Sequence, residues 1–233
     1  MGLESIAYRD GDTQLTGWLA RPVGTPRGTV LVLPTIMNPN PPMERRAAML
    51  ADAGFIAMVA DFYGQPVRDF EHSFELAGAL RASVDGYRAR LFAGLSALTG
   101  RPEAQGLKTA AIGYCMGGQA ALELAREGAD LVLAASFHGI LDTDRPAAPG
   151  AVKARILVCH GDADPLVPRS QVTAFWEEMD VAGANWHFHA YSGVKHGFTD
   201  PGSDGRGVPA IGYDASADRQ SWASLMGLFG EVF

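Results

Sequence analysis

The chain has 233 residues, of which 47% are hydrophobic, enough for a sizeable core, and its formal net charge is −7. This negative charge argues against a nucleic-acid-binding protein, since phosphate binding needs clustered Lys and Arg. No apolar run is long enough to span a membrane and no signal-peptide pattern opens the sequence, so we expect a cytoplasmic protein with no membrane partner and two reduced thiols.

The N-terminal part alternates strand and helix patterns. In chain order it predicts a hairpin around an Asp-Gly turn, a buried strand, a short helix, a second buried strand and a long helix, at residues 4–21, 28–34, 43–54, 55–62 and 70–98. The long helix is predicted because apolar residues recur in steps of three and four from Phe70 to Leu98.

The C-terminal part continues the alternation. In chain order it predicts a strand, a helix, two strands, a helix, an alternating strand and a last helix, at residues 108–115, 116–128, 131–138, 154–162, 170–183, 185–193 and 216–233. Continuous apolar strands between helices indicate an α/β fold with a mainly parallel sheet covered on both faces. No repeat or linker divides the chain, so we predict one domain over residues 1–233. Ligands of such folds bind beyond the carboxyl ends of the strands.

The run GYCMGG, residues 113–118, places a cysteine at a glycine-flanked turn between a predicted strand and a predicted helix. It fits G-x-C-x-G, the thiol version of a nucleophile elbow. Gly113 and Gly117 would avoid a Cβ clash with backbone, and a helix that starts at Met116 would direct its positive end at the sulfur. A packing cysteine and a phosphate-binding turn are the alternatives, but the phosphate-loop patterns are absent. The motif favours a catalytic thiol at Cys115.

An elbow nucleophile is followed along the chain by an acid and then by a histidine. Asp162 and Asp164 both follow the strand predicted at 154–162. Asp164 precedes Pro165, which favours an extended backbone that projects the side chain, whereas Asp162 is expected to brace the loop. We predict Asp164 as the acid and keep Asp162 in reserve; a carboxylate that only caps the next helix is the alternative.

Six histidines compete for the role of base. Three of them precede the acid and are excluded by chain order: His72, His138 and His160. His187 and His189 share one face of a predicted strand, and their spacing matches no familiar metal site. His196 lies in a glycine-flanked loop after that strand, from which it can reach the thiol. We therefore predict His196 as the base.

The three runs GYCMGG, HGDADPLVP and KHGF, in this order, resemble the dienelactone hydrolase family of the α/β-hydrolase fold. The resemblance covers essentially the whole chain, from LVLPTIMN and VADFYG to the last helix. It implies an α/β-hydrolase fold and a triad of Cys115, Asp164 and His196. It also implies an oxyanion hole made by the backbone N–H groups of Ile36 and Met116.

Two positions depart from the family pattern. Members that open dienelactones carry a glutamate, which activates the cysteine, where this chain has Thr35. Asp200 stands near the place of an arginine that holds the substrate carboxylate, in a loop that is extended over residues 199–213. Arg206 in that loop and Arg81 are candidate substitutes, and we predict Thr35 and Arg206 as substrate contacts. The specific family substrate is therefore not carried over to this chain.

Together these residues predict hydrolysis of a small-molecule ester or lactone through an acyl-thioester on Cys115. This chemistry calls for no metal and no organic cofactor. A second hypothesis is a non-catalytic ligand-binding or redox-sensing protein, since a sensor also needs an accessible thiol of low pKa. Against it, Cys159 lies within a predicted strand, where it would pack in the core and is badly placed to resolve a sulfenic acid. A thioesterase or a peptide hydrolase is the third hypothesis, and the sequence predicts no oligomeric state.

Overall fold

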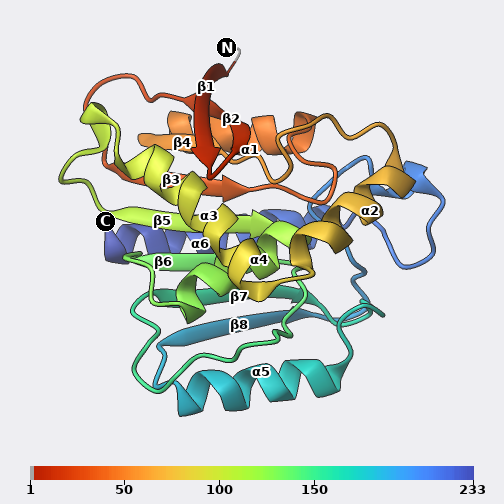
Figure 1. Ribbon diagram of the computed structural model, residues 1–233. Coiled ribbons are helices and arrows are strands. Elements are labelled where there is room, and N and C mark those ends of the chain that lie inside the picture. Colours follow the sequence, from red (N-terminus) through yellow and green to blue (C-terminus); the bar gives the residue numbers. More distant parts are fainter. Residues whose placement is uncertain (1–2) are drawn as a thin grey trace. The chain divides into compact units, whose positions relative to one another are not determined.

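The computed structural model describes residues 3–233 and divides into two compact units, Met1–Ile112 and Gly113–Phe233. The boundary falls inside strand β5, Thr109–Tyr114, so each unit includes part of this strand. One domain over the whole chain stays a prediction. The α/β class is confirmed, because strands and helices alternate along the chain after an N-terminal antiparallel hairpin (Figure 1).

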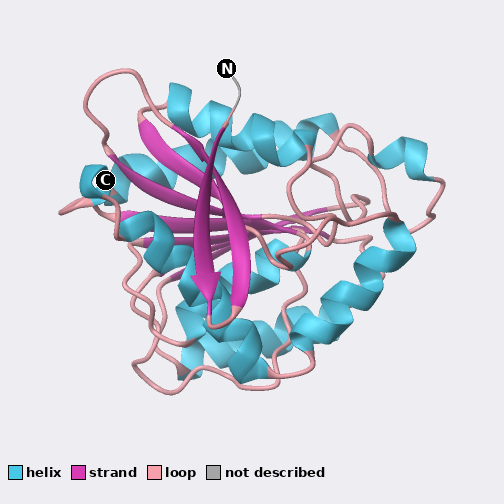
Figure 2. Ribbon diagram, turned by 45° about the horizontal axis from the view of Figure 1, so that its top comes forward, coloured by secondary structure: helices cyan, strands magenta, loops and turns pink. Residues whose placement is uncertain are grey.

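The first unit holds the hairpin and the first two parallel strands. Its elements are β1 (Glu4–Asp10), β2 (Thr13–Ala20), β3 (Gly28–Leu33), α1 (Pro41–Asp52), β4 (Phe55–Val59), α2 (Phe70–Arg81), α3 (Val84–Thr99) and the short 3-10 helix Pro102–Ala104. The strand order is β1-β2-β4-β3-β5. β2 runs antiparallel to β1 and β4, whereas β3 and β4 are parallel. The predicted hairpin is confirmed, and its long strands are clear in Figure 2.

The prediction of one helix from Phe70 to Leu98 is wrong, because two helices occupy this segment. α2 ends at Arg81, and Ser83 has an extended backbone at the N-cap of α3. The Ser83 hydroxyl accepts a hydrogen bond from the Gly86 N–H at 3.2 Å, which satisfies one of the free donors of the new helix. The apolar period continued through this capping signal, so periodicity alone concealed the break.

The second unit contains the remaining parallel strands and their helices. After β5 come α4 (Met116–Arg126), β6 (Leu133–Phe137), β7 (Arg155–Gly161), α5 (Arg169–Val181), β8 (Trp186–Tyr191), the 3-10 helix Ser203–Arg206 and α6 (Ala215–Val232). The strand order is β5-β6-β7-β8, and β6, β7 and β8 are mutually parallel. α4 and α6 both pack on β6, from opposite faces of the sheet (Figure 1).

Burial explains why the predicted strands form. Every residue of β3, β4, β5 and β6 is buried, as expected for continuous apolar runs in a sheet covered on both faces. Parallel strands also bring their carboxyl ends to one edge of the sheet. In the second unit this edge receives the segments that follow β6, β7 and β8, which contain the predicted acid and base. Within residues 3–233 no helix is both long and apolar enough to cross a membrane.

Candidate active site

The backbone at Cys115 has the strained geometry of a sharp strand-to-helix turn. Its φ of 57° and ψ of −120° lie in a region that L-residues seldom occupy, and such strain persists where the surrounding structure enforces it. Cys115 is the N-cap residue of α4, and its side chain makes no capping hydrogen bond. The sulfur therefore lies at the positive end of that helix, where a thiolate is favoured, and the residue is partly exposed.

Gly113 allows this turn to close. A Cβ at position 113 would lie 1.8 Å from the Gly117 carbonyl oxygen and 2.1 Å from its carbonyl carbon. Neither atom can withdraw without moving the first turn of α4. The expectation that this turn presses against backbone is met at Gly113.

Gly113→Ala is expected to destabilise the protein by at least about 3 kcal/mol, because the clash is with backbone and cannot be relieved by a rotamer change. Gly227→Ala in α6 is the matched control: a Cβ there has no neighbour within 4 Å, so the change should be neutral or stabilising by about 0.5–1 kcal/mol. Urea denaturation followed by circular dichroism measures both. Equal midpoints for the two variants would contradict the close approach at Gly113.

Asp164 and His196 form a buried hydrogen-bonded pair. Asp164 Oδ2 lies 2.7 Å from His196 Nδ1, and the two side chains are 0% and 5% exposed. Asp164 Oδ1 accepts a second hydrogen bond from the Leu166 N–H at 2.9 Å, which fixes the carboxylate plane. A carboxylate on Nδ1 keeps the proton on that nitrogen and leaves Nε2 for chemistry.

The backbone of the segment after His196 folds back and holds the histidine in place. The His196 N–H donates to the Ala210 carbonyl at 3.1 Å, and the Gly212 N–H donates to the His196 carbonyl at 3.0 Å. Gly197 has a φ of 71°, and its carbonyl accepts from the Ser203 hydroxyl at 2.8 Å. The extended loop predicted at 199–213 is thus tied to the predicted base.

Cys115 affects the pKa of the His196 ring. Burial lowers the pKa of His196, but the charge of Cys115, together with hydrogen bonding from Asp164 and Cys115 and the charge of Asp164, raises it to about 10. Nε2 nonetheless has no hydrogen-bond partner of ordinary geometry among residues 3–233. Loose contacts of this kind are common in unliganded active sites, which tighten when substrate binds.

The raised pKa of His196 predicts a pH effect with a definite sign. Because the folded pKa of about 10 exceeds the ordinary value of about 6.5, the stability that this proton contributes is complete below pH 6.5 and is lost as pH rises through 10. NMR titration of the His196 ring protons should show protonation persisting well above neutral pH. In Cys115→Ala the pKa should fall, since the largest cause that raises it is removed. The same titration midpoint in both proteins would contradict this coupling.

His138 is a further residue at this site, and sequence reasoning excluded it. Its Nδ1 accepts a hydrogen bond from the Cys115 N–H at 3.1 Å, and its ring stands edge-to-face on the His196 ring with centroids 5.1 Å apart. The chain-order rule identifies a base but says nothing about other histidines near the nucleophile. Its position immediately after β6, next to β5 in the strand order, was the available signal.

The family model for the dienelactone hydrolase family matches residues 15–233. The chain belongs to the dienelactone hydrolase family. A probable 2-oxo-3-(5-oxofuran-2-ylidene)propanoate lactonase from Bradyrhizobium sp. is 28% identical over 216 residues, which cover 85% of this chain and 86% of that protein. An uncharacterised protein from Caenorhabditis elegans is 38% identical over 149 residues, which cover 63% of this chain and 94% of the relative.

Solved structures agree with this membership. A dienelactone hydrolase-like promiscuous phosphotriesterase from metagenomic libraries is similar with a TM-score of 0.94 and 36% identity, over 99% of this chain and 98% of that one. An acylaminoacyl peptidase from Pyrococcus horikoshii has a TM-score of 0.74 at 14% identity, over 100% of this chain and 42% of that one, which shows the fold alone. The predicted α/β-hydrolase fold is confirmed.

Other residues predicted for a dienelactone hydrolase family member make local contacts. Asp162 forms a surface ion pair with Arg169 at 2.7 Å, so it braces the loop as expected. Arg206 pairs with Asp200 within the 199–213 loop, and Arg81 ends α2. A substrate contact at Arg206 remains a prediction, and Arg81 remains a candidate substitute for the family arginine.

Cys159 is fully buried, and burial raises the pKa of its thiol to about 12, as befits core packing. No group of three or more His, Cys, Asp or Glu side chains in the described part of the chain is arranged to hold a metal ion.

Thr35, at the family's glutamate position, has its hydroxyl engaged in the turn. Its Oγ1 accepts from the Met37 N–H and the Asn40 side-chain amide, each at 3.2 Å. Asn40 in turn caps α1 by accepting from the Met43 N–H. These bonds are the turn chemistry weighed for Thr35, and a substrate contact there remains a prediction.

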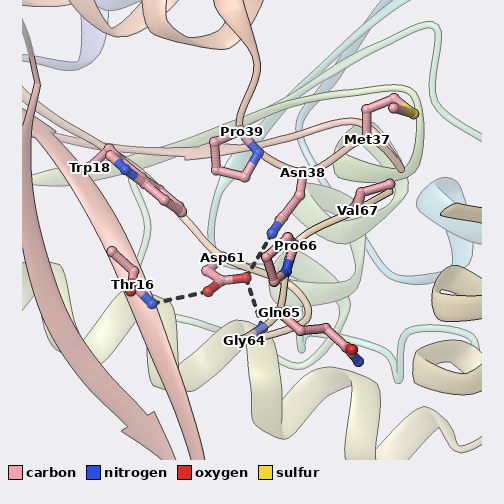
Figure 3. A pocket seen from close by; sticks show the side chains of 10 residues that line it. All are labelled: Thr16, Trp18, Met37, Asn38, Pro39, Asp61, Gly64, Gln65, Pro66 and Val67. Carbon is pink, nitrogen blue, oxygen red and sulfur yellow. Dashed lines mark hydrogen bonds between the residues drawn. The ribbon is translucent and has the colours of Figure 1, made fainter. Parts of the chain in front are cut away.

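Asp61 stabilises the loop that contains Ile36, a feature that the sequence did not reveal. Its carboxylate accepts from the Asn38 side-chain amide at 2.7 Å, from the Thr16 N–H at 3.0 Å and from the Gly64 N–H at 2.9 Å (Figure 3). It also accepts from the Tyr63 N–H at 2.9 Å. It lies at one side of a pocket of about 420 Å³. The pocket is lined by Thr16, Trp18, Met37, Asn38, Pro39, Asp61, Gly64, Gln65, Pro66 and Val67. Because four protein donors already bind the carboxylate, we assign Asp61 the structural role of stabilising this loop.

Ile36 is fixed by the same network. The Tyr63 hydroxyl donates to the Ile36 carbonyl at 3.1 Å, and Asn38, two residues later, is held by Asp61 with a φ of 60°. No acceptor for the Ile36 N–H is found in the described part of the chain. The predicted oxyanion pair combines Ile36 of the first unit with Met116 of the second, and it stays a prediction.

Asp61→Ala is expected to lower the free energy of unfolding by at least about 3 kcal/mol, because it leaves several donors without an acceptor. Asp12→Ala, at an exposed position in the hairpin turn, should change it by less than about 0.5 kcal/mol. Urea denaturation of both variants tests the network. Equal stabilities would show that Asp61 does not hold the loop.

Proposed function

We propose that this protein is a cysteine-dependent hydrolase of carboxylic esters or lactones. The observation that supports it best is the buried Asp164–His196 pair. The pKa of its imidazole is raised by the charge of Cys115, which lies at the strained N-cap of α4. Family membership supports hydrolysis in general. Because one relative is called a probable lactonase, lactones join open-chain esters as expected substrates.

The first half-reaction transfers the acyl group to sulfur. The Cys115 thiolate attacks the carbonyl carbon, and the C=O electron pair moves to an oxyanion that the N–H groups of Ile36 and Met116 would stabilise. The C–O bond to the leaving group then breaks as His196 Nε2 donates its proton to the departing alkoxide. An acyl-thioester on Cys115 and a neutral His196 result.

The second half-reaction returns the enzyme to its resting form. His196 Nε2 accepts a proton from water while the water oxygen attacks the thioester carbonyl, and the C–S bond breaks to release the carboxylic acid. Thiolate and imidazolium are regenerated together. A raised pKa of His196 favours this resting pair at neutral pH, because each charge stabilises the other.

A substrate panel tests the proposal. p-Nitrophenyl acetate, short lactones, an acyl thioester, a peptide amide and a phosphotriester are compared on wild type and His196→Ala. We expect His196-dependent turnover of esters and lactones and little cleavage of the amide, whose leaving amine needs stronger protonation. The phosphotriester is included because a neighbour at 36% identity is called a promiscuous phosphotriesterase. His196-independent rates for every substrate would refute the proposal.

A redox sensor is the rival from another class, and the same proteins distinguish it. Cys159, the second thiol, is 0% exposed and lies inside β7, so it cannot readily resolve a sulfenic acid on Cys115. A sensor would show reversible oxidation of Cys115 by peroxide and no turnover. A hydrolase shows turnover whether or not its thiol is also oxidisable.

A further inference from the structure

His138 connects the two segments that contain Cys115 and His196. It directly follows β6, is 2% exposed, and its N–H donates to the Cys159 carbonyl at 2.8 Å. Its φ of 42° is a left-handed conformation that a residue with a Cβ seldom adopts. Strain of this kind at a buried histidine beside a nucleophile calls for a function.

The ring of His138 has a defined tautomer. The Cys115 N–H can only donate, so Nδ1, 3.1 Å away, is the unprotonated acceptor. Nε2 therefore bears the proton and donates to the Thr199 hydroxyl oxygen at 2.9 Å. The neutral ring spans from the amide of Cys115 to a side chain three residues beyond His196. The same Cys115 N–H also lies 3.1 Å from the Phe137 carbonyl, so it is held from two sides.

We propose that His138 is a positioning residue that holds the nucleophile Cys115 and the base His196 in the correct relative position. Through Nδ1 it anchors the amide of a residue in a strained conformation, and through Nε2 it anchors the loop that follows His196. Its ring also fills the space beside His196, with 5.1 Å between ring centroids, and beside Phe198, with 5.2 Å. The inference rests on the proposed function, because the relative position of the Cys115 sulfur and the His196 imidazole matters only if the two react together.

Three variants separate the two contacts. His138→Leu removes both, Thr199→Val removes the hydroxyl alone, and His138→Asn keeps a carbonyl oxygen near the place of Nδ1 but cannot reach Thr199. His187→Leu, on β8 of the same unit, is the matched control for loss of an imidazole. Each protein is measured for thermal stability, for kcat and KM per titrated active site with p-nitrophenyl acetate, and for the rate of Cys115 alkylation by iodoacetamide.

We expect His138→Leu to lower kcat per active site by about 10- to 100-fold with little change in KM, since small misplacements of reacting groups are costly. Alkylation of Cys115 should slow as well. His138→Asn should recover part of the loss, Thr199→Val should show a smaller loss, and His187→Leu should match wild type. A His138→Leu protein that melts earlier but keeps wild-type kcat and alkylation rate would overturn the proposal.

The two proposals fail in different ways. If wild type turns over no ester or lactone, the hydrolase proposal falls, and the alkylation rates alone decide whether His138 positions Cys115. If His138→Leu does not fold, His138→Asn and Thr199→Val decide, and wild-type rates in both would refute the positioning role.

Discussion

Cys115→Ala is expected to lower kcat/KM for p-nitrophenyl acetate by about 10⁴-fold or more, because the proposed mechanism forms its acyl intermediate on this sulfur. The residue lies at the N-cap of α4 and is partly exposed, so removal of the sulfur should leave the fold intact. Steady-state kinetics and circular dichroism measure the two effects.

Cys159→Ala is the matched control for loss of a thiol. Cys159 is fully buried within β7, so its truncation should cost about 1–2 kcal/mol of stability and leave kcat near the wild-type value. A large loss of activity in Cys159→Ala, with activity retained in Cys115→Ala, would reverse the assignment of the nucleophile.

Asp164→Asn is expected to lower kcat by about 10³- to 10⁴-fold while preserving the fold. The Asn amide would present either a donor to His196 Nδ1–H or a weaker, neutral acceptor. In the first case the ring must change tautomer, which places the proton on Nε2. A protonated Nε2 cannot serve as a base. The pKa of His196 should also fall, since charge and hydrogen bonding from Asp164 help to raise it.

Asp162→Asn provides the control that the sequence itself suggests. The Asp162 side chain is partly exposed and its partner is the exposed surface residue Arg169, so its neutralisation should change kcat by less than about threefold. Comparison of the two variants by steady-state kinetics decides between the chosen acid and the reserve. A greater loss in Asp162→Asn would show that the wrong aspartate was chosen.

The strands and the elbow could be predicted because their signals are local. The continuous apolar runs at 28–34 and 55–62 contain buried parallel strands. The glycine at position 113 indicated a close backbone contact, which Gly117 makes. The helix break before Ser83 also has a local signal, its capping hydroxyl, but the apolar period masked it.

The residues that sequence reasoning missed depend on contacts between distant segments. Asp61 meets Asn38 across 23 positions, and His138 meets Thr199 across 61, so no short motif contains either pair. Asp61 and His138 each follow a buried strand closely, and residues just beyond the carboxyl ends of strands are where parallel sheets commonly bind ligands. A search of polar residues just beyond every predicted strand would have found them; the rule of nucleophile, acid and histidine order discarded His138.

Mass spectrometry of the intact protein after brief exposure to a slowly hydrolysed ester tests the central claim most directly. We predict a mass increase equal to one acyl group, located by peptide analysis at Cys115, absent from Cys115→Ala and accumulating in His196→Ala if the thioester forms but is not hydrolysed. Ester turnover by wild type with no adduct under any quenching condition, or an adduct at another residue, would contradict an acyl-thioester on this sulfur.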